Sequence, residues 1–242
     1  MKKQILSVVL GSLVSSMAAA AHWGYEGAEG PSHWAELSSE FDTCATGKNQ
    51  SPINLTHMVK GDLPALKINY AKGGQQIVNN GHTVQVNYTP GSTLEVDGHT
   101  YELKQFHFHT PSENNIEGES FPMEAHFVHA DKDGNLAVVA VMFKIGDFNP
   151  ELEKAWSQMP AMAGDQQQLK HVVSAANLLP KDHNYMRFSG SLTTPPCTEG
   201  VSWFVMKGYD TASKEQIEHF AHTMHHNNNR PLQAMNARVV VQ

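Results

Sequence analysis

Alternating apolar and polar residues predict β-strands along much of this chain. Successive side chains of a strand point to opposite faces of a sheet, so an alternating run indicates a strand with one buried face. Residues 83–88 follow this pattern, with Val84, Val86 and Tyr88 on one face, after the hairpin-type turn Asn79-Asn80-Gly81. Other strand candidates are residues 53–55, 68–70, 76–78, 92–96, 99–103 and 136–145.

Helical periodicity is confined to two short segments. In residues 213–225 apolar positions recur at i, i+3, i+4 and i+7, and Ser213 with Gln216 forms a capping-box pattern at the start. The apolar stripe consists of Ile217, Phe220, Ala221 and Met224. Residues 150–159 predict a second, shorter helix.

The balance of these elements indicates the fold class. The chain has no internal repeat, low-complexity tract or linker, and strands outnumber helices. The run 136–145 is continuously apolar, which indicates a strand buried on both faces. We therefore predict an α+β, strand-dominated single domain with a large central, mostly antiparallel twisted sheet and short peripheral helices.

Two of the predicted strands have histidines on matching faces. In Gln105-Phe106-His107-Phe108-His109, the residues Gln105, His107 and His109 share one face and the phenylalanines share the other. In Glu124-Ala125-His126-Phe127-Val128, the alternate residues Glu124, His126 and Val128 share a face in the same way. If the two strands pair antiparallel, three imidazoles converge on one wall.

Three neutral imidazoles are the ligand set of one type of catalytic zinc site, which leaves a fourth position for water. A ligating histidine usually donates its other ring N–H to a carboxylate or carbonyl. Gln105 and Glu124 lie one same-face step from a histidine and are the candidate acceptors. We predict that His107, His109 and His126 bind a metal; the alternative is a half-buried strand whose histidines have other partners.

A second group of histidines lies in and just after the predicted C-terminal helix. It consists of His219, His222, His225 and His226. Residues at i, i+3 and i+7 can share a helix face, so a second metal site is one interpretation. A solvated polar face beside the apolar stripe is the other.

The first 20 residues have the pattern of a signal peptide. Lys2 and Lys3 precede an apolar run over 5–14, and Ala18-x-Ala20 is a small-residue cleavage pattern. The apolar run is too short to cross a bilayer, and no other long apolar run follows, so we expect no membrane span. We predict a signal peptide over 1–20, a domain over 21–242 and a periplasmic or secreted protein; a retained N-terminal anchor is the alternative.

The net charge argues against one class of binding partner, and the cysteine content indicates a disulfide. The chain has 17 Lys and Arg against 24 Asp and Glu, a formal net charge of −7. Residues 1–20 contain two lysines and no acid, so their removal makes the balance of charges more acidic, which argues against nucleic acid as a partner.

Cys44 and Cys197 are the only cysteines of the sequence. In an oxidising compartment they are most simply one disulfide, which would stabilise the fold by about 4–5 kcal/mol in a chain-entropy model. Two free buried thiols are the alternative.

With the motifs above, the chain resembles the α-class carbonic anhydrases of the bacterial secreted type. The principal matching runs are Phe106-His107-Phe108-His109, Glu124-x-His126-x-Val128-His129 and Ser191-Leu192-Thr193-Thr194-Pro195-Pro196. Further matches are Trp23-Gly24-Tyr25, Gln50-Ser51-Pro52-Ile53, Asn79-Asn80-Gly81-His82 and Asn229-Arg230-Pro231. They follow the family's order over nearly all of 21–242, so the resemblance implies the α-carbonic anhydrase fold.

The resemblance implies a zinc-dependent enzyme that reversibly hydrates carbon dioxide to bicarbonate and a proton, by attack of zinc-bound hydroxide, with weak esterase activity. Zn²⁺ would be bound by Nε2 of His107 and His109 and by Nδ1 of His126. Carbon dioxide, bicarbonate and water would be its small-molecule partners, and sulfonamides or anions its inhibitors. A homodimer is expected by analogy with bacterial relatives.

The resemblance also assigns roles around the metal. Thr193 would accept a hydrogen bond from the hydroxide and donate its own to Glu113, and His82 would be the proton shuttle. Simple alternation puts His82 on the face of Val84, whereas Gln85 would be its cleft neighbour, so a turn or bulge is expected between 82 and 85. The substrate-binding residues would be Val128, Val138, Leu192, Thr193, Thr194, Val201 and Trp203.

Backbone features and one departure complete the resemblance. It implies cis peptide bonds at Ser51-Pro52 and Pro195-Pro196 and a bridge between Cys44 and Cys197. Phe188 occupies the position where many animal members have a tyrosine. A non-catalytic binding module on the same fold would be expected to lack a zinc ligand, and the His-Glu-x-x-His motif of common zinc peptidases is absent, so both alternatives are disfavoured.

Overall fold

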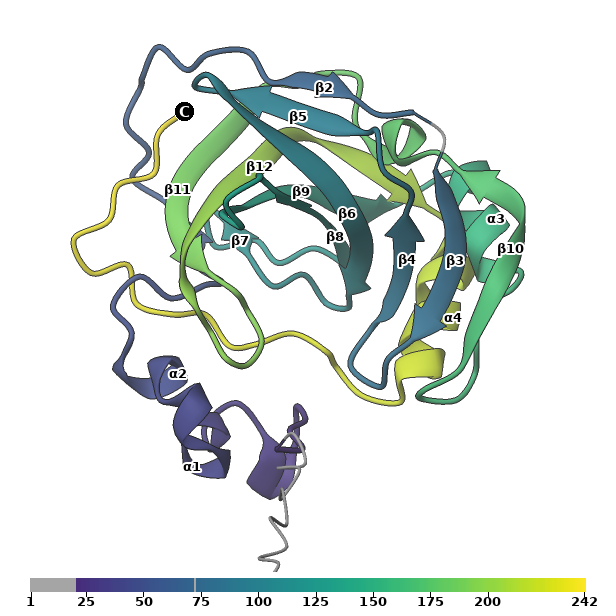
Figure 1. Cartoon of the computed structure of the whole chain (residues 1–242), viewed down its shortest axis with the longest axis horizontal. Helices are drawn as coiled ribbons and strands as arrows, with labels where there is room; N and C mark the ends of the chain where they lie inside the picture. The colour runs from purple at the N-terminus through teal and green to yellow at the C-terminus, as the bar shows by residue number, and fades with distance from the viewer. Residues whose placement is uncertain (1–20, 72) are drawn as a thin grey trace, which may run out of the picture.

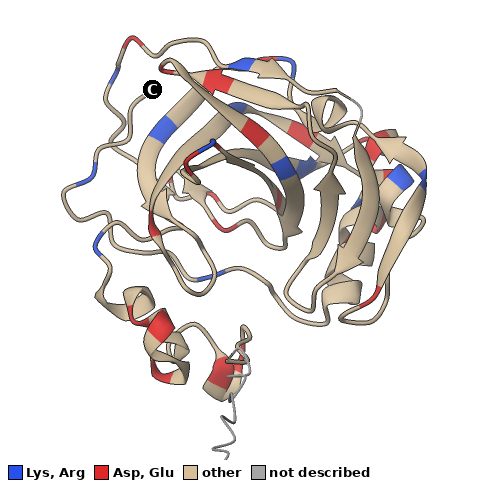
Figure 2. Cartoon of the chain, viewed as in Figure 1, with Lys and Arg blue, Asp and Glu red and all other residues tan. Residues whose placement is uncertain are grey.

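The computed structural model describes residues 21–71 and 73–242. The predicted signal peptide, residues 1–20, lies outside the described residues and stays a prediction. Within the described residues, no helix is both long enough and apolar enough to cross a membrane. Figure 2 shows acidic and basic residues interspersed along the loops and strands of the chain.

A ten-stranded, strongly curved sheet dominates the structure (Figure 1). Its main path runs β10-β3-β4-β6-β8-β9-β12-β11, and β5 joins β2 to β6. The strands are β2 (Lys67–Asn69), β3 (Gly74–Asn79), β4 (Val84–Tyr88), β5 (Thr93–Val96), β6 (His99–His109), β8 (Met123–Ala130), β9 (Leu136–Ile145), β10 (Gln166–Val173), β11 (Tyr185–Ser191) and β12 (Glu199–Ala212). A separate two-stranded parallel pair consists of β1 (Asn54–Leu55) and β7 (Asn115–Ile116).

The predicted mostly antiparallel sheet is confirmed, with one exception. Among the described pairings of the large sheet, β9 and β12 run parallel and the others run antiparallel. Parallel neighbours need a long crossover connection. Here that connection spans residues 146–198 and includes β10, β11 and the helix α3 (Pro150–Trp156).

The helices are short and peripheral, as predicted. The expected C-terminal helix is α4 (Lys214–Met224), and its Ser213–Gln216 capping box is present. The expected helix over 150–159 is the shorter α3, whose first N–H groups are capped by the Asn149 side chain. The remaining helical turns are η1 (Gly27–Glu29), α1 (Trp34–Leu37), η2 (Ser39–Phe41), α2 (Thr43–Thr46) and η3 (Ala175–Leu178).

Several strand predictions need correction. The segments 99–103 and 105–109 were expected as two strands, but they form the single strand β6, with a register shift against β8 between Leu103 and Gln105. Four strands, β7, β10, β11 and β12, were not predicted. β10 is an edge strand with mostly exposed side chains, so it shows no buried face, and β12 contains the register irregularity between Val205 and Tyr209.

The sheet buries apolar residues on both faces. Alternate residues of β9 divide between two clusters: Val139 and Val141 join the larger one, and Val138 and Ala140 join the smaller one. The continuous apolar run 136–145 is therefore explained by burial on both faces, as predicted. In the larger cluster, the phenylalanine face of β6 packs under α3 and α4, with the ring of Phe108 4.8 Å from that of Trp156.

A buried histidine on this core side is held in its neutral form. The ring of His129 lies between the Ala137 carbonyl, 3.1 Å from Nδ1, and the Tyr70 hydroxyl, 2.6 Å from Nε2. A carbonyl can only accept, so Nδ1 donates and Nε2 accepts the hydrogen of the tyrosine. Burial lowers the pKa of His129 to about 4.

His129 predicts a loss of stability in mild acid. Below pH 6.5 the unfolded chain binds a proton at this imidazole, whereas the folded protein does not until about pH 4, so the free energy of unfolding falls as the pH falls through this window. The contribution is about 3 kcal/mol. In urea titrations at pH 7 and pH 4, His129→Gln should lose that much less stability on acidification than the parent. The control is His219→Gln on the exposed face of α4; equal pH dependence in parent and His129→Gln would contradict the assignment.

Candidate metal centre

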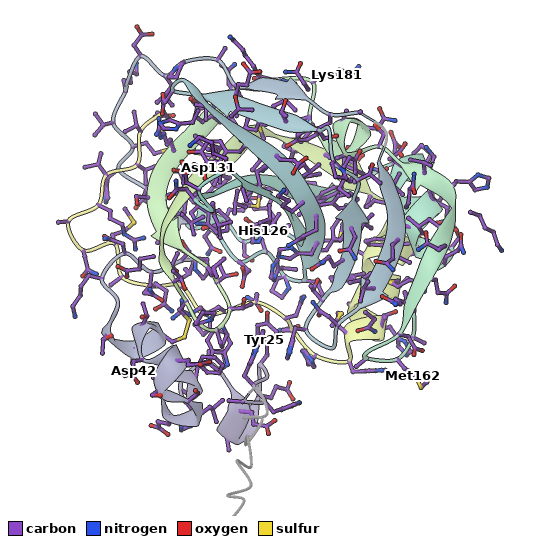
Figure 3. All side chains as sticks on the ribbon, viewed as in Figure 1. Tyr25, Asp42, His126, Asp131, Met162 and Lys181 are labelled. Carbon is purple, nitrogen blue, oxygen red and sulfur yellow. A yellow bond between two sulfur atoms is a disulfide. The ribbon has the colours of Figure 1, made fainter. Side chains whose placement is uncertain are left out.

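Three imidazoles converge on one face of the sheet where β6 pairs with β8. In the antiparallel register His107 lies opposite His126, and His109 lies opposite Glu124. One ring nitrogen from each histidine lies within 4.8 Å of the others. His126, labelled in Figure 3, lies inside the curve of the sheet, and it and His109 are almost fully buried. The predicted convergence of the three rings is confirmed.

Each histidine also has an oxygen within 2.9 Å of its other ring nitrogen. Nδ1 of His107 is 2.8 Å from Oε1 of Gln105, as the sequence predicted. Nε2 of His126 is 2.9 Å from Oε1 of Glu124, also at the expected position, although the angle of this contact is not that of a hydrogen bond. These contacts leave Nε2 of His107 and Nδ1 of His126 for a metal.

The acceptor of His109 was missed by the sequence interpretation. Its Nδ1 lies 2.7 Å from the main-chain oxygen of Asn228, 119 positions away in the chain. A carbonyl only accepts, so Nδ1 donates and Nε2 remains free. No strand periodicity could show this contact, because Asn228 lies in a loop; its position just before Asn229-Arg230-Pro231 is the only signal that the sequence offered.

The surroundings of the three rings fit a divalent metal. Nε2 of His109 is buried and has no hydrogen-bond partner among the described residues. Burial lowers the pKa of His107, His109 and His126, and neighbouring imidazoles add to the shift for His107 and His126. The neutral imidazole is the form that binds a metal, and three such nitrogens are a set that zinc uses.

Glu124 connects His126 to the following loop. Its Oε2 accepts hydrogen bonds from the main-chain N–H groups of Glu113 and Asn114 at 2.7 and 2.8 Å, and Oε1 accepts one from the Asn114 side chain at 2.8 Å. Burial raises the pKa of Glu124, and these hydrogen bonds oppose the shift. The orientation of His126 and the position of the 113–114 loop are therefore fixed by one carboxylate.

Glu113 lies directly beside the three rings. Its Oε1 accepts the main-chain N–H of Arg230 at 2.8 Å, and its Oε2 is 3.6 Å from Nε2 of His109. Burial raises the pKa of Glu113 to about 8, and hydrogen bonding from the Arg230 main chain and the Thr193 hydroxyl opposes this shift. Thr193 therefore lies near Glu113, and Oε2 of Glu113 has no hydrogen-bond partner among the described residues. A cation among the histidines would favour the ionised carboxylate.

The loop that positions Thr193 is anchored on both sides. The predicted disulfide between Cys44 and Cys197 is confirmed, and Cys197 also donates its N–H to the Thr194 carbonyl at 2.8 Å. Ser51 and Ser191 exchange two hydrogen bonds, each from the main chain of one to the hydroxyl of the other. The predicted cis bonds at Ser51-Pro52 and Pro195-Pro196 are present, and Thr110-Pro111 is a further cis bond that was not predicted.

Apolar side chains line the sheet next to His126. The ring of Trp203 meets that of His126 edge-on, with centroids 4.9 Å apart. The ring of Phe188 stacks on that of Trp203 with an interplanar angle of 9°, and as a phenylalanine it brings no hydroxyl to this position. The five predicted apolar substrate residues belong to one cluster: Val138, Val201 and Trp203 are buried in it, and Val128 and Leu192 are partly buried against it.

His82 lies at the edge of a small cavity beside the metal site. This cavity, of about 140 Å³, is lined by His82, Gln85, His107 and His109, among others. The expected turn is present, because the bend at 81–82 precedes the start of β4 at Val84 and lets both His82 and Gln85 face the cavity.

The ring of His82 has a defined neighbour. It stacks on Trp23 with centroids 3.7 Å apart and an interplanar angle of 8°. Burial lowers the pKa of His82 to about 4, and charge on His22 and His226 acts in the same direction.

The helix histidines do not form a comparable group. Among residues 21–71 and 73–242, only His107, His109 and His126 bring three candidate ligand atoms this close together. The rings of His222 and His225 are 5.9 Å apart, and both side chains are exposed. The solvated-face interpretation of α4 fits this arrangement better than a second metal site.

Comparison with known proteins gives concordant matches. A sequence-family model described as eukaryotic-type carbonic anhydrase matches residues 29–242. The carbonic anhydrase of Neisseria gonorrhoeae is 51% identical over 243 residues, which covers 98% of this chain and 96% of that protein.

Solved structures agree in fold. The α-carbonic anhydrase from Thermovibrio ammonificans, in complex with the inhibitor sulfanilamide, superposes with a TM-score of 0.91 at 48% identity, covering 93% of this chain and 100% of that chain. A hyperthermostable carbonic anhydrase from an active hydrothermal vent chimney has a TM-score of 0.89 at 55% identity, covering 91% and 99%. The fold expected from the sequence is confirmed by these neighbours.

Asn228 predicts a test of how the metal ligands are positioned. Its side chain donates to the carbonyls of Phe108 and His82 and accepts the N–H of Thr110, which fixes the main-chain oxygen that meets His109. Asn228→Ala should weaken metal binding by about 10–100-fold, the usual cost of losing an outer partner of a metal ligand. Competition with a chromophoric chelator measures this, with the exposed neighbour Asn227→Ala as the control. Equal metal affinity in parent and Asn228→Ala would show that the loop is held by other contacts.

Proposed function

The chain belongs to the eukaryotic-type, or α-class, carbonic anhydrase family, whose general reaction is the reversible hydration of carbon dioxide, and we propose that it catalyses this reaction with a zinc ion bound by His107, His109 and His126. The observation that carries the proposal is the set of three convergent imidazoles, each with an oxygen within 2.9 Å of its other nitrogen. That arrangement fixes tautomer and direction before a metal binds.

Zinc, when bound, supplies a Lewis acid that lowers the pKa of water to about 7, the value established for carbonic anhydrases, so a nucleophile is available at neutral pH. The protein's part is to present three neutral nitrogens and to leave one side open. The three rings come from two paired strands, and strand geometry positions side chains more rigidly than a loop would. We propose Nε2 of His107 and His109 and Nδ1 of His126 as the ligand atoms.

Thr193 and Glu113 would orient the nucleophile. If the Thr193 hydroxyl donates its single hydrogen to an ionised Glu113, only its lone pairs remain, so it must accept a hydrogen from the attacking oxygen. The attacking lone pair is then directed away from Thr193 and toward the substrate. The Arg230 main chain supports this arrangement, because it donates to the other Glu113 oxygen at 2.8 Å.

The apolar wall would accept carbon dioxide. The substrate has no net charge and needs no ion pair, and aliphatic and aromatic walls exclude competing water. We assign this role to Val128, Val138, Leu192, Val201 and Trp203, with Thr193 and Thr194 as the polar neighbours of the reacting atoms. The same nucleophile would give a weak esterase activity.

Inhibitors, location and assembly follow from the same reasoning. The Thermovibrio ammonificans relative was solved with sulfanilamide, and we propose that sulfonamides and small anions inhibit this chain too. The Cys44–Cys197 disulfide suits an oxidising compartment, which supports export of the chain to the periplasm or the medium. The homodimer expected by analogy stays a prediction.

Replacement of one proposed metal ligand should abolish both metal binding and activity. His126→Ala should lower the rate of carbon dioxide hydration by at least about 100-fold, more than the loss of an outer partner costs, and should bind less than stoichiometric zinc. Stopped-flow hydration with and without a chelator, together with elemental analysis, measures both. His219→Ala, on the exposed face of α4, is the control. Full zinc and full activity in His126→Ala would overturn the site assignment.

His82 should affect proton release and leave the attack on carbon dioxide unchanged. An imidazole near the cavity can accept the proton that hydration leaves behind. In dilute buffer His82→Ala should lower kcat for hydration by about fivefold or more, leave ester hydrolysis nearly unchanged, and regain hydration when imidazole is added. An unaltered kcat in dilute buffer would remove His82 from the mechanism.

A further inference from the structure

The proposed shuttle His82 is a weak proton acceptor in the arrangement that the structure shows. Its ring is half-buried and stacked on Trp23, and burial lowers its pKa to about 4. A water with pKa near 7 gives its proton to such a group about 1000-fold less favourably than to a matched one. Another base near the opening of the cavity, with a pKa closer to that of the water, would accept the proton more readily.

Two more imidazoles lie close to His82. Charge on either His22 or His226 lowers the pKa of His82, so both are within electrostatic reach of its ring. His22 has a carboxylate partner, because its Nδ1 is 3.1 Å from Oε2 of Glu29, and it is largely exposed. His226 lies next to a residue of the metal cavity: its ring centroid is 5.6 Å from that of Tyr25, which lines the cavity.

The position of His226 is tied to the metal site. Two residues further along, the main-chain oxygen of Asn228 accepts the Nδ1–H of His109 at 2.7 Å. The Asn228 side chain also donates to the main-chain oxygen of His82 at 3.1 Å. The segment 226–228 is therefore anchored to a proposed metal ligand and to the proposed shuttle at the same time.

The tautomer of His226 leaves an acceptor free. Its Nδ1 is 3.0 Å from the main-chain oxygen of Asn227, and because a carbonyl cannot donate, Nδ1 carries the hydrogen. Nε2 of the neutral ring then has an unshared pair. His226 also lines a second cavity of about 350 Å³, between the turn 79–81 and the end of α4, so its partly buried ring borders a space outside the metal cavity.

We propose that His226 is a second proton acceptor, which passes protons from the metal cavity to the solvent alongside His82. The inference rests on the proposed hydration activity. An O–H bond of cavity water breaks, an N–H bond forms at Nε2, and the imidazolium then loses that proton to a buffer base. The titratable groups that face this step are Tyr25, His22 and His82, with His225 next in the chain.

The decisive variant is His226→Asn. Asparagine can still donate to the Asn227 carbonyl, but its side chain accepts no proton, so the loop is kept and the base is removed. His225→Asn is the matched control: this neighbour has φ 63°, a conformation that asparagine tolerates well, and its charge is not among those that lower the pKa of His82.

Comparing kcat with kcat/KM separates proton transfer from the attack on carbon dioxide. In dilute buffer of low proton-accepting capacity, His226→Asn should lower kcat for hydration by about two- to fivefold, with kcat/KM unchanged. His226→Asn combined with His82→Ala should lower kcat by about tenfold or more, and added imidazole should restore it in every variant. An equal fall in kcat and kcat/KM would indicate a structural effect and overturn the proposal.

Nuclear magnetic resonance gives a readout that is independent of turnover. Removal of a positive charge near His82 should raise its pKa, so the ring resonances of His82 should titrate at higher pH in His226→Asn than in the parent and in His225→Asn. An unchanged His82 titration, or an unchanged kcat in both the parent and the His82→Ala background, would overturn the role of His226. A zinc-loaded parent without hydration activity would overturn the proposed function and this inference together. If the parent is active but His226→Asn changes neither kcat nor the titration of His82, this inference alone is overturned.

Discussion

The register between β6 and β8 is the constraint on which the metal site depends. Strand side chains alternate with a period of two, so a slip of one residue would turn every side chain of β6 to the opposite face. The histidines would then enter the core and Phe106 and Phe108 would face the cavity. The phenylalanines prevent this, because Phe106 lies directly opposite Phe127 in the register, with ring centroids 5.4 Å apart. Apolar packing on one face of the sheet therefore positions the imidazoles on the other.

Polar groups buried behind the imidazoles add a second layer of constraint. Two carboxylates, Glu113 and Glu124, are almost fully buried, and such groups are costly unless hydrogen-bonded. Glu124 has three donors, and Glu113 has the main chain of Arg230. The Arg230 guanidinium in turn donates to the main-chain oxygens of Cys44 and Ser51. The network thus links the metal site to the disulfide and to the N-terminal part of the chain.

The imidazoles proposed to exchange protons lie where the N-terminal arm, residues 21–25, meets the loop after α4. Trp23 and Tyr25 of the arm line the metal cavity, and the loop after α4 brings the ring of His226 to 5.6 Å from that of Tyr25. Figure 3 shows the labelled Tyr25 between the N-terminal segment and the opening of the sheet. This boundary is more solvated than the histidine wall, and a group that exchanges protons with bulk water needs such solvation.

The sequence by itself determined the elements whose pattern is local. Strand parity placed the three histidines on matching faces, the capping box located the start of α4, and the apolar run 136–145 indicated a strand buried on both sides. These inferences succeeded because side-chain direction along a strand or helix depends only on the spacing of neighbouring residues.

Only the tertiary structure decided the contacts between distant segments. It joined His109 to Asn228 across 119 positions, placed β12 parallel to β9, and stacked His82 on Trp23. None of these has a local period: a main-chain carbonyl is the same chemical group in every residue, and the depth at which a ring is buried depends on what packs over it. The identities of the proposed metal ligands were therefore readable from the sequence, whereas the orientation of His109 and the lowered basicity of His82 follow from folding alone.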